Sequence, residues 1–257
     1  MLAIAISKRS GFWVSFSGSR RDITKTLLGG DAMGWVVIFC KSSIGKKALM
    51  SCTGLFLCLF LIVHLSGNFS LYIGKDAFNT YTDLLSHLPL IKVAEVIMVL
   101  VFAVHIFLAA TLTIENRLAR PQRYAMDVSA GARTFMSSYM FHTGAIVLIF
   151  LFIHIWTFKY GDWSHDLALV GNPENLTLYD LVAARFGEAY YSIGYIAAML
   201  VLGFHLNHAF QSAFQTLGLN HKKYTPFIKK LGTLYAAVIA IGFSSFPIYF
   251  LFFNQYR

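Results

Sequence analysis

The run from Ala48 to Ile73 constrains this chain more than any other stretch. It contains no Asp, Glu, Lys or Arg, and its one histidine is His64. A helix rises ~1.5 Å per residue, so this run is long enough to cross the hydrocarbon core of a bilayer. An imidazole at that depth needs a polar partner, because an unsatisfied polar group in lipid costs several kcal/mol. His105, His154 and His205 occupy later apolar runs in the same way, and the four histidines must be explained together.

Five apolar runs have the length and the flanking charges of membrane spans. We expect helices at about 47–73, 92–115, 136–159, 189–217 and 231–253. Charged residues make up 13% of the chain, whereas a soluble domain carries roughly 25%. The sequence therefore predicts an all-α integral membrane bundle of five transmembrane helices.

The segments outside the spans are short. We expect 74–92 to be a short loop, with Pro89 opening the second helix. The stretch 176–186 is typical of a short amphipathic helix lying at the membrane interface. Residues 1–32 are basic and rich in Gly and Ser, so we expect a flexible N-terminal extension ahead of a five-helix domain at 33–257.

The positive charges predict the orientation of the bundle. If the N-terminus is cytoplasmic, sixteen of the 21 Lys and Arg residues lie inside and five lie outside. Cytoplasmic segments carry such an excess, so we expect a bacterial inner-membrane protein with its C-terminus outside. The net charge of +9 then reflects membrane topology and a basic docking face, and nucleic acid is not expected as a partner.

Depth along each helix sorts the histidines into two pairs. His64 lies ~25 Å from the inner end of its span and His154 ~8 Å from the outer end of its own, so both belong to the outer half. His105 and His205 lie ~15–18 Å from inner ends, so both belong to the inner half. Facing neutral imidazoles in a helical bundle are typical of bis-histidine ligation of a haem iron.

Other residues add to this interpretation. Gly54 and Gly144 each precede a histidine of their own helix by ten residues, near the inner level. A missing side chain there would admit a flat ring, although close helix packing is an equal alternative. The cysteines are Cys40, Cys52 and Cys58, and the chain has no CxxCH motif, so neither covalent haem nor an iron–sulfur site is expected.

Further polar residues near the inner level have weaker roles. His208 could bond a haem propionate or a quinone, or it could form a plain interhelical hydrogen bond. His142 is the main competitor as a ligand on the third span. Ser42 and Ser51, with His208, define a possible inner quinone site.

The chain from Met33 onward resembles the di-haem cytochrome b membrane anchor of succinate dehydrogenases and fumarate reductases, in the single-polypeptide type with five helices. The residues that carry this resemblance are SSIGKKALMSCTGLFLCLFLIVHLSGN, DAFNTYTDLLSHLPLIKVAEV, VHIFLAATL, FIHIWTF, GFHLNHAFQSAFQTLGLN and KKLGTLYAAVIAIGF. The resemblance spans every helix in order and excludes residues 1–32.

The resemblance implies two non-covalent b haems whose axial ligands are His64, His105, His154 and His205. It implies a flavoprotein partner that interconverts succinate and fumarate, and an iron–sulfur partner, both docked on the cytoplasmic face. The chain would then be the quinone-reactive subunit of the enzyme, with assembly into a higher oligomer left open. The polar candidates for the quinone site, near the outer haem, are Asn68, Tyr81, Asp83, His87 and Glu95.

The chain departs from the resembled family at one position, and a rival interpretation of the histidines stays open. Some fumarate reductases of this family carry a glutamate two residues before the fourth-helix ligand for transmembrane proton transfer, and this chain has Gly203 there. A proton route of that kind is therefore not expected. The rival interpretation is a haem-free transporter or proton relay that uses the membrane histidines directly.

Overall fold

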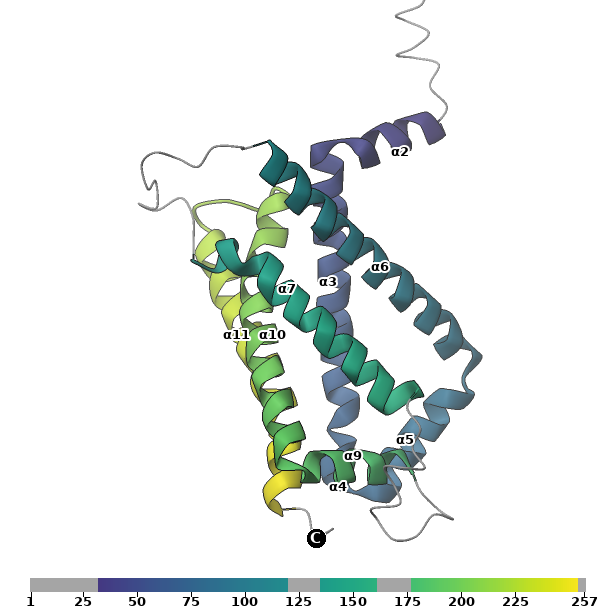
Figure 1. Ribbon diagram of the computed structural model, residues 1–257. Helices are drawn as coiled ribbons and strands as arrows, with labels where there is room; N and C mark the ends of the chain where they lie inside the picture. The colour runs from purple at the N-terminus through teal and green to yellow at the C-terminus, as the bar shows by residue number, and fades with distance from the viewer. Residues whose placement is uncertain (1–31, 120–134, 161–176, 254–257) are drawn as a thin grey trace, which may run out of the picture. The chain divides into compact units, whose positions relative to one another are not determined.

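The computed structural model describes residues 32–119, 135–160 and 177–253, and all regular elements within these ranges are helices (Figure 1). The chain divides into two compact units, Met1–Ser43 and Ile44–Arg257. The first unit contains the short apolar helix α2 (Ala32–Lys41). Residues 1–31 lie outside the described ranges, so the flexibility expected of the N-terminal extension stays a prediction.

The second unit contains the long helices, and the prediction of an all-α chain with five membrane-length helices is confirmed. The helices are α3 (Ser43–Asn68), continued by α4 (Ser70–Ile73); α6 (Pro89–Leu118); α7 (Phe135–Ile155), continued by the π-helical turn η1 (Trp156–Tyr160); α10 (Ala189–Thr216); and α11 (Thr225–Phe253). In Figure 1, α3, α7 and α11 run in one direction, and α6 and α10 run in the other. The fifth helix begins at Thr225 rather than at Leu231.

Local signals in the sequence set several helix ends. Pro89 occupies the first turn of α6 as predicted, where its missing N–H costs no hydrogen bond. After α10, Gly218 adopts a φ of 83°. Its N–H donates to the carbonyl of Gln215, and the N–H of Leu219 donates to that of Phe214. This is a Schellman motif, which terminates the helix at Thr216.

The segment 74–92, expected to be a loop, is mostly helix, and that prediction is wrong. Helix α5 covers Lys75–His87, between Gly74 and Leu88. Phe78 is buried on this helix, and Leu85 lies two turns later on the same side. This helical spacing of apolar side chains within a polar segment is the reason that the segment folds as it does.

The helix expected within 176–186 is present as α9 (Leu178–Gly187), and its position at a membrane interface stays a prediction. It packs against α5, α10, α11 and η1. Its buried residues are Tyr179, Asp180, Leu181, Val182, Ala183 and Phe186. Thr177 and Asp180 form a capping box at its first turn, and the Asp180 carboxylate pairs with Lys75 of α5 at 2.7 Å.

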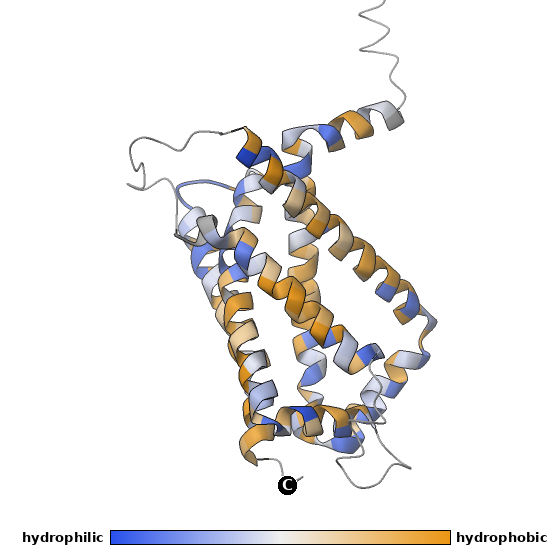
Figure 2. Cartoon of the chain, in the orientation of Figure 1, coloured by the Kyte–Doolittle hydropathy of each residue, from blue (hydrophilic) through white to orange (hydrophobic). Residues whose placement is uncertain are grey.

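The packed core of the second unit is one-sided. Buried apolar side chains come mostly from α9, α10, α11 and the end of α3 that leads into α4. By contrast, Leu108 is the one buried residue of α6, and α7 has none among its described side chains. Apolar residues such as Val99, Phe107 and Phe152 are about two-thirds exposed. Figure 2 shows the long helices hydrophobic along their middles and more hydrophilic toward their ends, as in a bundle surrounded by lipid.

Candidate functional site

The structure brings His64 of α3 and His154 of α7 together. Their ring centroids lie 5.9 Å apart, with the rings nearly perpendicular. Each ring stacks on the aromatic residue one turn earlier in its own helix, Phe60 for His64 and Phe150 for His154. The Tyr195 hydroxyl of α10 lies 3.0 Å from Nδ1 of His154. These contacts orient the outer pair.

Asn68 contacts His64, the other member of the outer pair. Its amide nitrogen donates to the His64 carbonyl at 2.7 Å and lies 3.4 Å from Nδ1 of the same residue. The predicted polar residue at the end of α3 therefore lies directly beside the histidine. Nε2 of His64 has no hydrogen-bond partner among the described residues.

The inner histidines lie against two other helices in matching ways. Nδ1 of His105 on α6 is 3.1 Å from Oγ1 of Thr53 on α3. Nδ1 of His205 on α10 is 3.1 Å from Oγ1 of Thr143 on α7. His205 also interacts electrostatically with His105. Each inner histidine therefore has one threonine beside its ring, on the neighbouring helix, and the pairing of His105 with His205 stays a prediction.

Gly54 and Gly144 adjoin those threonines and give the rings their room. A Cβ added at Gly54 would lie 3.4 Å from Cε1 of His105, and one added at Gly144 would lie 3.4 Å from Cε1 of His205. A larger side chain at either position would meet the imidazole. The inner level predicted for both glycines thus coincides with the inner histidines.

Each inner histidine, with the threonine and glycine that it contacts, forms a half-site. The threonine and glycine of the two half-sites belong to a sequence repeat. The residues 53–64 read TGLFLCLFLIVH, and 143–154 read TGAIVLIFLFIH. Threonine, glycine, the stacking phenylalanine, the following leucine and the histidine recur at one spacing. We missed Thr53 and Thr143 as site residues, and this repeat is the signal that identifies them. Tyr195 has no such signal, because it reaches His154 from another helix.

The remaining inner candidates are less tightly placed. Ser51 is buried on α3, where its hydroxyl donates to the Lys47 carbonyl at 3.0 Å. His208 is half-buried and interacts electrostatically with His205. His142 is exposed, and its ring contacts the ring of Phe141 edge-on. Its position outside the paired histidines weakens its candidacy as a ligand.

The five quinone candidates do not form one cluster. Tyr81 of α5 reaches α3, where a Cβ added at Gly67 would clash with its ring and hydroxyl unless the tyrosine moved. This contact places Tyr81 against the residue that precedes Asn68 in α3. By contrast, Asp83 and His87 are more than three-quarters exposed, with 3.7 Å between Oδ1 of Asp83 and Nδ1 of His87.

Glu95 belongs to a different contact, at the start of α6. Its Oε1 lies 2.5 Å from Nζ of Lys159 on η1, and its Oε2 lies 3.8 Å from Nζ of Lys92. The π-helical turn begins two residues after His154 and places Lys159 against α6. Glu95, a quinone candidate from the sequence, therefore forms an ion pair between two helices.

Gly203, which stands where some relatives of the resembled family carry an acid, is closely packed. A Cβ there would lie 2.9 Å from Cβ of Ala240 on α11. Any side chain would push the two helices apart, because the neighbouring atom is close to the backbone. The packing of α10 on α11 thus gives a structural reason for glycine at this position.

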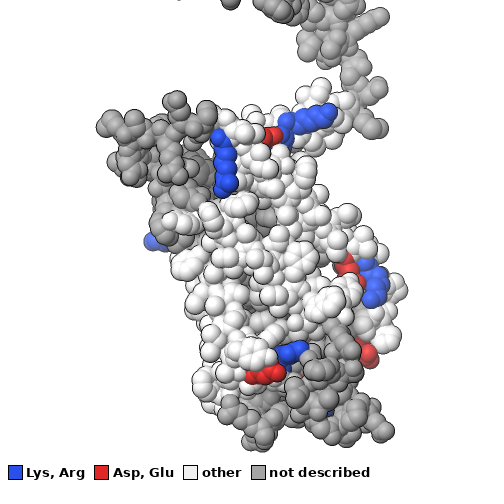
Figure 3. Space-filling model, viewed as in Figure 1, with Lys and Arg blue, Asp and Glu red and all other residues white. Residues whose placement is uncertain are grey.

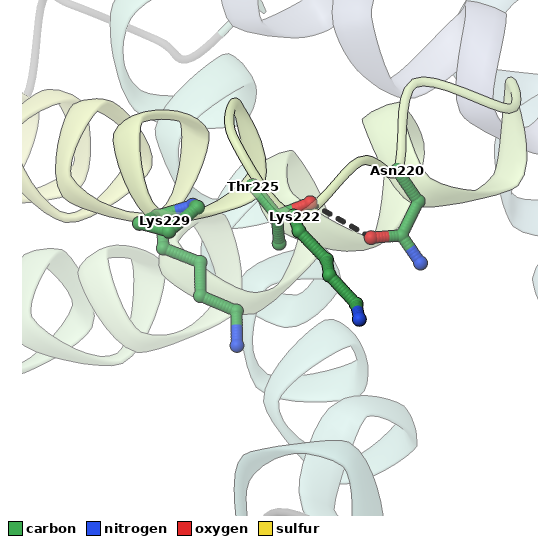
Figure 4. Close-up of a pocket in the computed structure, with 5 residues that line it drawn as sticks. Asn220, Lys222, Thr225 and Lys229 are labelled. Carbon is green, nitrogen blue, oxygen red and sulfur yellow. Dashed lines mark hydrogen bonds between the residues drawn. The ribbon is translucent and has the colours of Figure 1, made fainter.

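An open depression lies apart from the histidines, at the start of α11. Its volume is about 500 Å³, and its lining residues are Asn220, Lys222, Thr225, Pro226 and Lys229 (Figure 4). The Thr225 hydroxyl donates to the Asn220 side-chain oxygen at 2.8 Å. On the face of the second unit shown in Figure 3, charged side chains lie near helix ends and the surface between them carries none.

No protein-family model matches the chain, and neither a curated protein nor a solved structure matches it. In the described ranges, no group of three or more His, Cys, Asp or Glu side chains is placed to hold a metal ion.

Proposed function

We propose that this chain is the membrane-anchor cytochrome b subunit of a succinate:quinone oxidoreductase, either a succinate dehydrogenase or a fumarate reductase. It would bind two b haems and carry electrons between a cytoplasmic iron–sulfur subunit and membrane quinone. The succinate and fumarate chemistry would belong to a partner flavoprotein.

The observation that carries the proposal is the contact between His64 and His154, two of the four histidines at membrane depth. Two imidazole nitrogens, each ~2 Å from one metal ion, put their ring centroids roughly 6 Å apart. The His64 and His154 centroids are 5.9 Å apart. A haem iron needs only two protein ligands, since the porphyrin supplies the others.

The surroundings of the histidines also fit a flat prosthetic group. Gly54 and Gly144 leave each inner ring against a helix without a side chain between them. All four Nδ1 atoms have a polar neighbour, while the four Nε2 atoms have no hydrogen-bond partner among the described residues. Metal-binding histidines commonly use one nitrogen for the metal and donate the N–H of the other to an acceptor, and a hydroxyl oxygen is so placed at His105, His154 and His205. The Asn68 amide nitrogen beside His64 is instead a donor. Bound between these pairs, haem would supply one-electron redox chemistry.

Quinone chemistry and partner docking would use opposite ends of the bundle. Quinone reduction takes up protons, so a hydroxyl or carboxylate must lie near the head group. Tyr81, beside Gly67 and Asn68, meets this need better than the exposed Asp83 and His87. At the other end, Lys222, Lys223, Lys229 and Lys230 offer positive charge to an iron–sulfur partner.

A haem assay with an optical redox titration of the complex, purified in mild detergent, tests the proposal. We expect two non-covalent b haems per chain that titrate in separate steps and are reduced by succinate or by quinol. One haem would mean that a ligand pair is wrong. A folded preparation without haem would overturn the cytochrome and favour the histidine transporter.

Single substitutions test the pairing itself. We expect His105→Ala to lose the inner haem and keep the outer one, and His64→Ala to do the reverse. His142→Ala is the matched control, because this exposed histidine belongs to neither pair, and we expect it to keep both haems. Equal loss of both haems from either single change, in protein that remains folded, would contradict the pairing.

A further inference from the structure

Thr53 and Thr143 hold equivalent places beside the two inner histidines. The distance from Oγ1 to Nδ1 is 3.1 Å in both cases. The two contacts involve different helices, α3 with α6 and α7 with α10. The two distances agree, and the two threonines occupy equivalent positions in the sequence repeat. We therefore regard the contact as a specific feature of the fold and not as a chance contact.

Backbone carbonyls lie within hydrogen-bonding reach of the hydroxyl of each threonine. Thr53 Oγ1 donates to the carbonyls of Leu49 and Met50, at 2.9 and 3.0 Å. Thr143 Oγ1 donates in the same way to Tyr139 and Met140, at 3.2 and 3.1 Å. A hydroxyl has a single proton, so when that proton goes to one of these carbonyls the oxygen accepts from the imidazole.

This arrangement favours the same tautomer of both inner histidines. Nδ1 must carry the proton that the threonine oxygen accepts, and a neutral imidazole has just one N–H. Nε2 is therefore left with its lone pair, as a metal ligand requires. The outer pair is held differently, by Tyr195 at His154 and by the weaker Asn68 contact at His64.

We infer that Thr53 and Thr143 are positioning residues that set the tautomer, the ring plane and the basicity of the inner pair of haem ligands. This inference rests on the proposed function. A hydrogen bond accepted from Nδ1–H makes the imidazole a better electron donor. A better donor favours the more positive, oxidised iron, so the two threonines lower the reduction potential of the inner haem.

The test uses Thr53→Val and Thr143→Val, which keep the side-chain volume and remove the hydroxyl. We expect the inner haem to be retained ~10–100-fold less tightly, the typical effect of losing such a neighbour. The inner haem that remains should titrate at a higher potential with a shifted low-spin EPR signal, while the outer haem is unchanged. Thr53→Ser and Thr143→Ser keep the hydroxyl and should behave as the unmodified protein does.

Thr113→Val is the matched control. Thr113 of α6 donates to the Ala109 carbonyl at 2.7 Å, like the other two, but it has no hydrogen bond to a histidine within the described ranges. The inner signal is assigned as the one that His205→Ala removes. If valine prevents folding, Thr53→Ala and Thr143→Ala remove the same hydroxyl without the second methyl group.

The outcomes separate the two claims. Two haems in the unmodified chain, with threonine variants indistinguishable from Thr113→Val, would overturn this inference and leave the proposed function standing. The same holds if the serine variants lose the inner signal as the valine variants do. A folded, unmodified chain without haem would overturn both.

Discussion

At the scale of single residues, the inner half-sites depend on the absence of two side chains. The imidazoles of His105 and His205 lie at ordinary contact distance from the place where a Cβ would stand at Gly54 and Gly144. An alanine would just touch the ring, whereas a branched side chain would occupy its place. The glycines therefore have a definite task besides close helix packing.

We expect Gly54→Leu and Gly144→Leu to displace the inner histidines, so that the chain retains about one haem instead of two. The pyridine haemochrome ratio of haem to protein measures this loss. Gly194→Leu is the control, because a Cβ at Gly194 on α10 meets nothing within 4 Å. Full haem content in both half-site variants would mean that the rings do not need this space.

The histidines themselves could be predicted from the sequence, because depth in an apolar run follows from counting residues along a helix. Their neighbours were harder to find. Thr53 lies in an apolar run with nothing beside it in the sequence that indicates a polar contact. Its partner, His105, lies on another helix. A contact between helices depends on their rotation about their axes, which hydropathy does not determine. Tyr195 was missed for the same reason.

At the scale of elements, α5 and α9 are joined at the end of the bundle where α3 leads into α4. Lys75 of α5 pairs with the buried Asp180 of α9, and the Asn79 side chain accepts from the N–H of Tyr179 at 3.3 Å. Burial alone would raise the pKa of Asp180, but hydrogen bonds from Lys75 and Thr177 outweigh it and leave the pKa below its ordinary value. The sequence predicted neither contact, since α5 was expected to be a loop.

We expect Asp180→Asn to destabilise the folded chain by about 1–3 kcal/mol at pH 7, because it removes charged hydrogen bonds at a buried site. A depressed folded-state pKa stabilises the fold above the unfolded-state pKa of about 3.9. The advantage of the unmodified chain should therefore be complete at neutral pH and disappear as the pH falls through the lower, folded-state pKa. Thermal unfolding in detergent at several pH values measures this difference.

The control for that measurement is Asp83→Asn on α5. Asp83 is 76% exposed and interacts with His87 at the surface, where such pairs contribute little. We expect no more than a few tenths of a kcal/mol from it. A difference between Asp180→Asn and the unmodified chain that does not vary with pH would contradict the role given to the carboxylate.

At the scale of the whole molecule, the two ends of the second unit differ in their charge balance. At the end that holds α5, α9 and η1, the positive side chains of Lys75, Lys92, Lys159 and Arg185 each face an acid. At the opposite end, Lys46 pairs with Glu115. The four lysines near the start of α11 have no acidic partner among the described residues: Lys222, Lys223, Lys229 and Lys230.

This imbalance sharpens the prediction of topology. Charge that is neutralised by a neighbouring acid is weakly available to a partner surface, whereas the lysines before and within the first turns of α11 remain available. Because cytoplasmic segments carry an excess of positive charge, we expect that end to lie inside. The positive end would then meet the iron–sulfur partner, and the neutralised end would face the other side of the membrane.

Cysteine labelling of sealed membranes tests the orientation. In a cysteine-free background, Ser86→Cys on α5 and Lys222→Cys before α11 put one thiol at each end, both at exposed positions. With right-side-out vesicles and a membrane-impermeant maleimide, we expect Ser86→Cys to react at once and Lys222→Cys to react only after permeabilisation. Inverted vesicles should exchange the two results, since the reagent then meets the cytoplasmic face. The opposite pattern in both preparations would reverse the topology and remove the lysine-rich end as a docking face for a cytoplasmic partner.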